Sequence, residues 1–491
     1  MDDSLRALLA NLVSDLERRF PYAAALYTSA SGTRASIDNR EQSASLQDPS
    51  QGVVFTLLSG ESFEEYATSN LEPEHLARDV RAWAESIPIV RNQPAQAGFV
   101  VAKPPPGTGA RAEGENAGAG HPQAPVAAGV SLDASSLERF KTPCQIAPAS
   151  LSLPEKLERL RGLQSRARGF HPQIVNARLS YSDTEETKLF IGDGRQMLQE
   201  ITRISLFASI IVSDGQSMQH NWLAHAGTGG LEVIEVSEPE LAGVCETTLR
   251  LLDAEKIEPG LYEVVTDPTV SGVIAHECFG HGVELDLFPK GRSRSASYFD
   301  QRVAAPGVEM YDDPTVPGAY GSYFFDDEGQ PAAPTQILRD GVLVSPISDL
   351  MSALLTKRRR TANGRRESYA SKSYARMSNT FFGAGKTPSA DLLAGLEQGI
   401  YLRQASSGME DPMGWGVQVT AHYGEEIRSG QPTGRLFAPI GITGYVPDLL
   451  QSISGIGSDV ALDGGWCGKG HKEWVPVSSG GPHLRMKARL G

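Results

Sequence analysis

Hydrophobic positions along the chain switch between helical and strand-like spacing. Residues 5–16 place leucine and valine at three- and four-residue intervals, which predicts an amphipathic helix that packs by one face. Residues 22–68 change to short apolar runs separated by Ser-Gly turns, which is typical of an antiparallel β meander. Helical spacing returns over about 73–87, where we expect a second helix.

The order of helix and then meander recurs after a stretch that is rich in proline, glycine and alanine. This stretch, residues 103–128, has too few apolar side chains to offset its ordering entropy, so we predict a flexible linker. A capping box at Ser152 predicts the next helix, and residues 173–226 predict further strands. The recurrence hints at a degenerate repeat, although no residue-level identity links its halves.

A further region begins near Ser237, where another capping box predicts a helix. Residues 261–265 predict a strand, and Ser271 is the expected N-cap of the helix that follows it. An Asp-Gly pair at residues 340–341 predicts a hairpin turn. Residues 436–440 predict a strand that is interrupted by an edge proline.

Residues 276–281, His-Glu-Cys-Phe-Gly-His, carry the clearest chemical signal. They combine two imidazoles with an adjacent carboxylate, as a hydrolytic metal site requires. The histidines of the familiar zinc-protease helix are four residues apart, whereas these are five apart. Five steps leave the rings roughly 140° apart around an α-helix, which is too far to bind one ion. A π-type bulge would bring His276 and His281 together, and Gly280 and Gly282 would lower its steric cost.

A catalytic metal is favoured over both coincidence and a structural zinc site. Chance rarely places two histidines and a glutamate in this arrangement. A structural zinc site usually takes four side chains and has no need of a neighbouring glutamate.

A mononuclear catalytic zinc ion usually takes three protein ligands, so the two histidines need a partner. Cys467 is the first candidate, because glycines on both sides let the backbone turn tightly and a thiolate binds zinc strongly. Glu284 and Asp286 are alternative carboxylate ligands. Arg376 and His422 are candidate oxyanion or substrate contacts, although a salt bridge and a surface histidine are the commoner roles for such residues.

Several segments beyond the motif resemble the TldD/PmbA metallopeptidase family. They are residues 325–329, residues 376–380, and residues 465–470 leading into Pro476-Val477-Ser478. The resemblance covers residues 237–491 well and the N-terminal part more loosely. It implies a zinc-dependent peptidase in which His276, His281 and Cys467 hold the ion and Glu277 is the catalytic base.

The resemblance also implies a substrate and a partner. The active subunit of the family cleaves unfolded or extended peptides and works with a related subunit that lacks the motif. This chain keeps all four positions, so we expect a homo-oligomer or a heterodimer with a motif-lacking subunit. The ion would lower the pKa of water and polarise the scissile carbonyl, while Glu277 would pass a proton to the leaving amine.

Two other functions remain open. The chain could be a regulatory or peptide-binding module that uses its metal site without hydrolysis. It could also be a maturation protease for one dedicated modified peptide.

The net charge and the cysteine content restrict the classes of partner and the cellular compartment that we expect. A net charge of −14 argues against nucleic acid and anionic membranes, because the mean field repels phosphate. The basic cluster at 357–366 could meet phosphate or an acidic partner, but a solvated loop or an intersubunit salt-bridge site is the expected role. Four cysteines without paired spacing, no secretion signal and no membrane-spanning segment predict a cytoplasmic protein.

These patterns together predict an α+β fold. It has N-terminal helices with antiparallel β meanders, followed by a C-terminal mixed α/β region that carries a metal-binding helix. The predicted divisions are an N-terminal α+β region, the linker, a second helix-plus-meander region and the metallopeptidase region, at residues 1–102, 103–128, 129–235 and 236–491.

Overall fold

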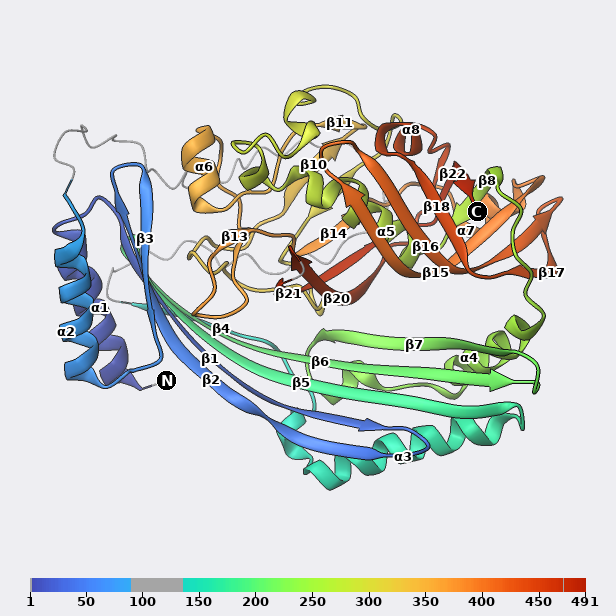
Figure 1. The fold of residues 1–491 in the computed structure, drawn as a ribbon, viewed down its shortest axis with the longest axis horizontal. Helices are drawn as coiled ribbons and strands as arrows, with labels where there is room; N and C mark the ends of the chain where they lie inside the picture. The colour runs from blue at the N-terminus through green and yellow to red at the C-terminus, as the bar shows by residue number, and fades with distance from the viewer. Residues whose placement is uncertain (1, 90–135, 471) are drawn as a thin grey trace, which may run out of the picture.

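The fold mixes helices with largely antiparallel sheets, so the predicted α+β class is confirmed (Figure 1). The computed structural model describes residues 2–89, 136–470 and 472–491. The predicted linker at 103–128 lies outside the described residues, and the division at 129–235 and 236–491 stays a prediction. Within the described ranges, no helix is long and apolar enough to cross a membrane.

One seven-stranded sheet dominates the N-terminal half. Its order is β3-β2-β1-β5-β6-β4, and β7 also pairs with β6. Both predicted meanders belong to this sheet, because β1 pairs with β5 along its length. The first strand of the second predicted meander, β5, runs without a break over Ile174–Gly192. The bounds are β1 Ala23–Ile37, β2 Gln42–Ser59, β3 Ser62–Thr68, β4 Leu137–Lys141, β5 Ile174–Gly192, β6 Arg195–Ser213 and β7 Met218–Thr228.

Helices cover one face of this sheet, and the C-terminal region covers part of the other (Figure 1). Successive strand side chains point to opposite faces. Phe55 and Leu189 therefore pack under the helices, whereas Val54 and Phe190 pack against Phe325 of the C-terminal region. The four helices predicted before residue 260 are present, with bounds α1 Asp3–Glu17, α2 Pro73–Ser86, α3 Leu153–Phe170 and α4 Glu238–Arg250.

Two larger sheets build the C-terminal region. One has the order β11-β10-β9-β14-β21-β20. In the other, β15, β8, β22, β18 and β16 form a closed ring, because β15 pairs with both β8 and β16. The strands are β8 Gly260–Thr266, β9 Met310–Asp312, β10 Thr335–Arg339, β11 Val342–Leu343, β12 Gly364–Arg365, β13 Tyr374–Ala375, β14 Asn379–Phe382, β15 Gln398–Asp411, β16 Gly416–Arg428, β17 Gln431–Phe437, β18 Ile440–Tyr445, β19 Gly455–Ile456, β20 Ala461–Lys469, β21 Lys472–Gly481 and β22 Leu484–Leu490.

Short helices and turns connect these strands. Helices α6 Leu350–Thr356, α7 Ser389–Ala394 and α8 Val446–Gln451 lie between them in the chain. The predicted Asp-Gly hairpin is confirmed, since Asp340 and Gly341 have φ of 47° and 73° between β10 and β11. Pro439 lies between the end of β17 and the start of β18, so it separates two strands.

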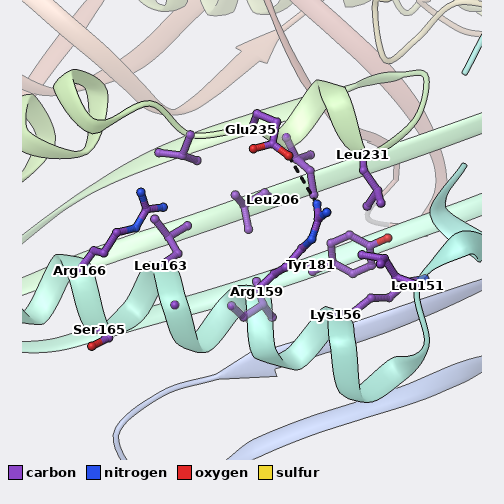
Figure 2. Close-up of a pocket in the computed structure, with 14 residues that line it drawn as sticks. Leu151, Lys156, Arg159, Leu163, Ser165, Arg166, Tyr181, Leu206, Leu231 and Glu235 are labelled. Carbon is purple, nitrogen blue, oxygen red and sulfur yellow. Dashed lines mark hydrogen bonds and ion pairs between the residues drawn. The ribbon is translucent and has the colours of Figure 1, made fainter. Parts of the chain in front are cut away.

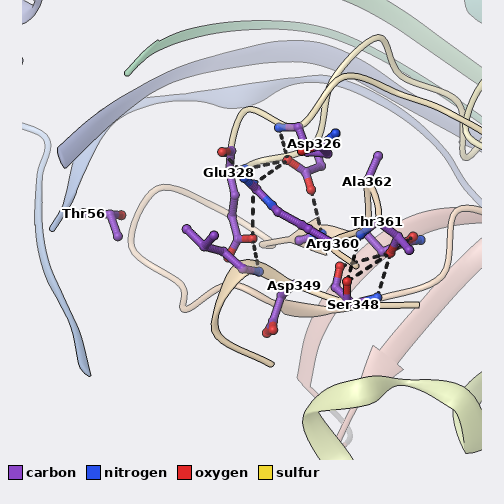
Figure 3. A network of polar contacts seen from close by, with 12 residues as sticks. Thr56, Asp326, Glu328, Ser348, Asp349, Arg360, Thr361 and Ala362 are labelled. Atoms are coloured by element: carbon purple, nitrogen blue, oxygen red, sulfur yellow. Dashed lines mark hydrogen bonds and ion pairs between the residues drawn. The ribbon is translucent and has the colours of Figure 1, made fainter. Parts of the chain in front are cut away.

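The basic cluster at 357–366 has an exposed half and an inner half. Lys357, Arg358 and Arg359 are exposed, as expected of a solvated loop, whereas Arg365 and Arg366 are buried and Arg360 is half-buried, which corrects the expectation for these three. Arg360 lies 3.6 Å from carboxylate oxygens of both Asp326 and Glu328 (Figure 3). Arg366 is buried and donates to Glu65 of β3 at 2.8 Å. Burial raises the pKa of Glu328 to about 8, against the lowering effect of Arg360. The acidic partners are distant in sequence and therefore left no local signal.

Candidate metal centre

Helix α5 (Pro268–Ala275) carries the His-Glu motif into the core. Asp267 is its N-cap, and the Asp267 carboxylate accepts a backbone N–H of the first turn at 2.9 Å. The prediction of Ser271 as the cap is wrong. Ser271 lies inside the helix, and its hydroxyl is 2.7 Å from that of Thr266.

The chain continues from α5 into a wider helical turn, as the five-residue spacing of the histidines predicts. Residues 276–280 form a π-helical turn, in which the N–H of His281 donates to the carbonyl of His276. The two imidazole centroids consequently lie 5.0 Å apart, with the rings at 88° to one another. A Cβ atom at Gly280 would collide with the sulfur of Met377, so this turn requires glycine there. The prediction of a π-type bulge is confirmed.

A close backbone approach sets the distance between α5 and the β20–β21 hairpin. A Cβ atom at Gly272 would lie 2.5 Å from the backbone nitrogen of Gly480 in β21. Because glycine has no Cβ atom, α5 packs directly on β21. The same hairpin carries Cys467, opposite Val475, so this contact brings Cys467 to the end of the helix.

Three predicted ligands converge at this point. Donor atoms of His276, His281 and Cys467 all lie within 4.8 Å of one another, and the Cys467 Sγ is 3.5 Å from Nε2 of His281. Among the described residues, the buried Nδ1 of His276 has no hydrogen-bond partner. Burial opposes the thiolate, but the two imidazoles outweigh it and hold the pKa of Cys467 well below its usual range. Two imidazoles and a thiolate are donors that zinc accepts, so the residues fit this ion.

The alternative carboxylate ligands, Glu284 and Asp286, lie beside this cluster of donor atoms and not within it. Oε2 of Glu284 is 3.5 Å from Nδ1 of His281. Lys469 donates to Glu284 at 3.0 Å and to Asp286 at 2.7 Å. Burial favours the neutral acid, but Lys469 and His281 hold the pKa of Glu284 far below its usual range. A carboxylate in this position orients a ligating imidazole and fixes its tautomer.

Glu277 lies beside strand β15. A Cβ atom at Gly408 would collide with Cγ of Glu277, so glycine lets the strand approach the predicted base. Glu410, two residues further along the strand, has both carboxylate oxygens buried without a hydrogen-bond partner in the described part of the chain. Burial raises the pKa of Glu410 well above its usual range, and the opposing effect of His281 does not reverse this. No local sequence pattern marks Glu410, because strand pairing alone brings it here.

Arg376 and His422, the predicted substrate contacts, lie in different surroundings. Arg376 is 1% exposed, and its guanidinium donates to the backbone carbonyls of Cys467 and Glu473. Nε2 of His422 lies 2.7 Å from the carbonyl of His220 in β7. Arg376 thus contacts a predicted ligand residue, whereas His422 lies where the C-terminal region meets the N-terminal sheet. A substrate role for either residue stays a prediction.

A cavity of about 590 Å³ lies between α3 and the N-terminal sheet (Figure 2). Leu160, Leu206 and Tyr181 line it, and an ion pair of 3.4 Å joins Arg159 to Glu235 across it. None of the predicted metal ligands lines this cavity. The predicted chemistry therefore belongs to the π-helical turn and the β20–β21 hairpin.

Family models match most of the C-terminal two thirds of the chain. Residues 146–254 match the PmbA/TldA metallopeptidase central domain, and residues 259–489 match the C-terminal domain of the same family. The chain belongs to the TldD/PmbA metallopeptidase family. The central-domain match covers α3 to α4, and the C-terminal match contains every residue of the metal centre.

Curated members of the TldD/PmbA family are similar over most of their length. A metalloprotease of Methanothermobacter thermautotrophicus is 33% identical over 64% of this chain and 69% of its own. A metalloprotease of Synechocystis is 30% identical over 69% of this chain and 73% of its own. A protein of Saccharolobus solfataricus named zinc metalloprotease TldD homolog is 25% identical over 68% of this chain and 75% of its own.

Solved structures share the fold. A structure from Thermotoga maritima, named as a putative modulator of a DNA gyrase, has a TM-score of 0.72 at 16% identity and full coverage of both chains. TldE from Thermococcus kodakarensis has a TM-score of 0.69 at 16% identity, over 98% of this chain and 99% of its own. At these identities the likeness shows the fold alone.

Proposed function

We propose that the protein is a zinc-dependent peptidase that hydrolyses unfolded or extended peptides. In this proposal, His276, His281 and Cys467 bind zinc, and Glu277 is the general base. The convergence of the three donor atoms within 4.8 Å, across a π-helical turn, carries the proposal. The zinc metalloprotease name of the Saccharolobus relative supports the choice of metal.

The residues around the site have separate tasks. Zinc supplies Lewis acidity, which lowers the pKa of water and polarises a carbonyl group. Glu277 accepts the proton of the attacking water and delivers it to the leaving amine. Glu284 holds His281 by Nδ1, so that Nε2 of the same ring faces Cys467.

The substrate binds, in our proposal, as a strand added to the free edge of β15. This strand pairs with β8 over Ile400–Leu402, and beyond Leu402 no described strand except β16 pairs with it. The N–H groups of Gln404 and Ala405 already donate to Asp267 and Thr269, so the edge that a peptide could use begins after Ala405. Glu277 lies close to this part of the strand, at Gly408. Backbone pairing accepts many side chains, which suits unfolded peptides. Proline substituted along a model peptide should block cleavage at positions that donate to the strand, and uniform cleavage would contradict pairing.

We also propose that the chain acts in the cytoplasm as an oligomer, either with itself or with a related subunit that lacks the motif. All four cysteines are thiols in the structure, which suits a reducing compartment. Light scattering on the chain purified alone and with co-expressed partners would separate the two assemblies.

Metal content and peptide cleavage, measured on the same preparations, test the proposal. Wild type should contain one zinc ion per chain and cleave an unstructured peptide. Cys467→Ala should lose zinc. Glu277→Gln should keep zinc but lose cleavage by roughly 10²- to 10⁴-fold. Cleavage that survives Glu277→Gln would contradict the assigned base, and wild type without metal would contradict the site.

A degenerate peptide library separates two versions of this activity. Broad trimming would support a general peptidase of unfolded chains. A single sharp cleavage motif would support a maturation protease for one dedicated peptide. Zinc without cleavage, with every partner present, would instead support a peptide-binding module.

A further inference from the structure

We infer that Arg376 is a positioning residue, which holds the Cys467 ligand in place relative to the His281 ligand and does not contact substrate. The inference rests on the proposed zinc site. It assigns Arg376 a different task from the substrate contact that its place in the sequence suggested.

The guanidinium of Arg376 binds both arms of the hairpin that carries Cys467. One amino group donates to the carbonyl of Cys467 at 2.6 Å, and the other donates to the carbonyl of Glu473 at 2.7 Å. Cys467 belongs to β20 and Glu473 to β21. A planar guanidinium offers donors in a fixed fork, so it fixes the separation of two carbonyls that a single ammonium could not span.

The remaining nitrogen of the same guanidinium faces the histidine side of the site. Nε of Arg376 lies 3.7 Å from Oε1 of Glu284, and the other oxygen of Glu284 lies 3.5 Å from Nδ1 of His281. The side chains of Arg376 and Glu284 are 1% and 2% exposed. One buried cation therefore connects the backbone of one predicted ligand to the carboxylate that orients another.

The backbone of Arg376 is itself fixed. Its N–H donates to the carbonyl of Asn363 at 2.9 Å, and the amide of Asn363 donates back to the carbonyl of Arg376 at 3.0 Å. Asn363 and Ser378 both donate to Asp312, which is fully buried. Arg376 thus projects from a rigid support toward the hairpin.

Arg376 connects two predicted ligands that the chain itself holds together only weakly. His281 and Cys467 are 186 residues apart in the chain and belong to different elements. Local opening of a hairpin costs less free energy than global unfolding, and such an opening would move the thiolate. Arg376 opposes it from inside the protein. Arg376 is 1% exposed, so its guanidinium presents no accessible surface to a substrate.

The test compares Arg376→Met and Arg376→Lys in the full chain, loaded with zinc or with cobalt(II) as a spectroscopic probe. Arg376→Met should weaken zinc binding by roughly 10- to 100-fold, as the loss of a residue supporting a ligand does. It should also weaken the thiolate-to-cobalt absorption band. Arg376→Lys, which can replace one donor, should recover part of both signals and serves as the second variant if Arg376→Met fails to fold.

Arg365→Met is the matched control. Arg365 is also buried and donates to a backbone carbonyl, that of Met377, at 2.6 Å, but within the described ranges it forms no ion pair with Glu284 and no hydrogen bond with Cys467. This variant should lose stability while keeping zinc affinity and the cobalt spectrum. Equal losses in Arg365→Met and Arg376→Met would overturn the inference, because both would then report instability.

The outcomes separate this inference from the proposed function. A wild type that binds no zinc would defeat the proposed function first. A wild type that binds zinc, beside an Arg376→Met variant with unchanged zinc affinity and cobalt spectrum, would overturn the inference alone. A raised KM with unchanged metal properties would mark Arg376 as a substrate contact and would also overturn it.

Discussion

Glu284 and His281 form a carboxylate–imidazole pair in which the two ring nitrogens have separate partners. Nδ1 of His281 lies 3.5 Å from Oε2 of Glu284, while Nε2 lies 3.5 Å from the Cys467 sulfur. A ring held in this way presents one defined nitrogen to a metal ion. The pair therefore predicts that metal affinity depends on a carboxylate that is not itself a ligand.

Glu284→Gln should weaken zinc binding by roughly 10- to 100-fold, because an amide orients the imidazole less strongly than a carboxylate does. Competition with a chromogenic chelator would measure the affinity. Asp286→Asn is the control, since Asp286 shares the Lys469 contact but forms no ion pair with His281 in the described part of the chain. Equal loss in both variants would assign the effect to Lys469 instead.

Gly280→Ala should destabilise the π-helical turn by about 1–3 kcal/mol and lower zinc occupancy, because its Cβ would collide with the Met377 sulfur. Met377→Ala would open space for that atom. The loss of unfolding free energy in the double variant should therefore be smaller than the sum of the losses in the two single variants, by about 0.5–3 kcal/mol in urea unfolding.

Gly162→Ala in α3 is the matched glycine control. Its Cβ would meet no atom within 4 Å, so the change should be neutral or stabilise the helix by up to about 1 kcal/mol. A similar loss of stability at both glycines would contradict a specific role for the space at Gly280.

Glu328→Gln should gain thermal stability over wild type as the pH rises. Burial raises the pKa of Glu328 to about 8 in the folded protein, from an ordinary value of 4.5. The folded state then keeps a proton that the unfolded state has released, so the free energy of unfolding falls between pH 4.5 and 8. Glutamine cannot titrate, and its amide oxygen still accepts the Leu350 N–H that Glu328 accepts at 2.7 Å.

Differential scanning calorimetry across that pH range would measure the effect. A Tm difference between Glu328→Gln and wild type that does not change with pH would contradict the raised pKa.

Lys156→Met should destabilise the protein by about 3–5 kcal/mol, because it leaves the Asp183 carboxylate buried without its cation. Nζ of Lys156 lies 2.7 Å from both Asp183 and Thr33, and the two charged side chains are 3% and 6% exposed. Lys156→Met combined with Asp183→Leu should recover most of the loss. Urea unfolding would measure each variant.

Arg161→Met tests the surface counterpart of this pair. Arg161 and Glu158 lie 2.8 Å apart but are 43% and 72% exposed, so the change should cost less than about 1 kcal/mol. A large loss of stability in Arg161→Met would mean that methionine itself destabilises α3. The Lys156→Met result would then not report on the buried ion pair.

Local spacing in the sequence predicted the helices and the widened turn. His276 and His281 are five positions apart and can bind one ion only if the helix is widened, and that geometry needs no knowledge of distant residues. The cap of α5 was harder to predict. Asp267 and Ser271 both have side chains that cap helices and lie four residues apart, and the one local signal that distinguishes them is Pro268, which occupies the first helical position after Asp267.

Buried charges were the part of the fold that sequence could not predict. Arg360 is one of several basic residues in its segment, yet it is surrounded by Asp326 and Glu328 from a segment about thirty residues earlier. Glu284 was predicted as a possible ligand, and its place behind His281 depends on Lys469 from the distant hairpin. Only the assembled fold brings such partners together, because periodicity reports burial of apolar faces and not the pairing of charges.

The widened turn could not be shortened without a loss of stability. Deleting one residue between the two histidines would restore ordinary helical spacing, and Cys278 and Phe279 are the natural ones to remove. Both are now fully buried core residues. Losing Phe279 would leave a cavity whose cost is about 3–5 kcal/mol, comparable to much of the stability of a domain. The residues that widen the turn thus also fill the core, and the metal site cannot be narrowed without disturbing the packing beneath it.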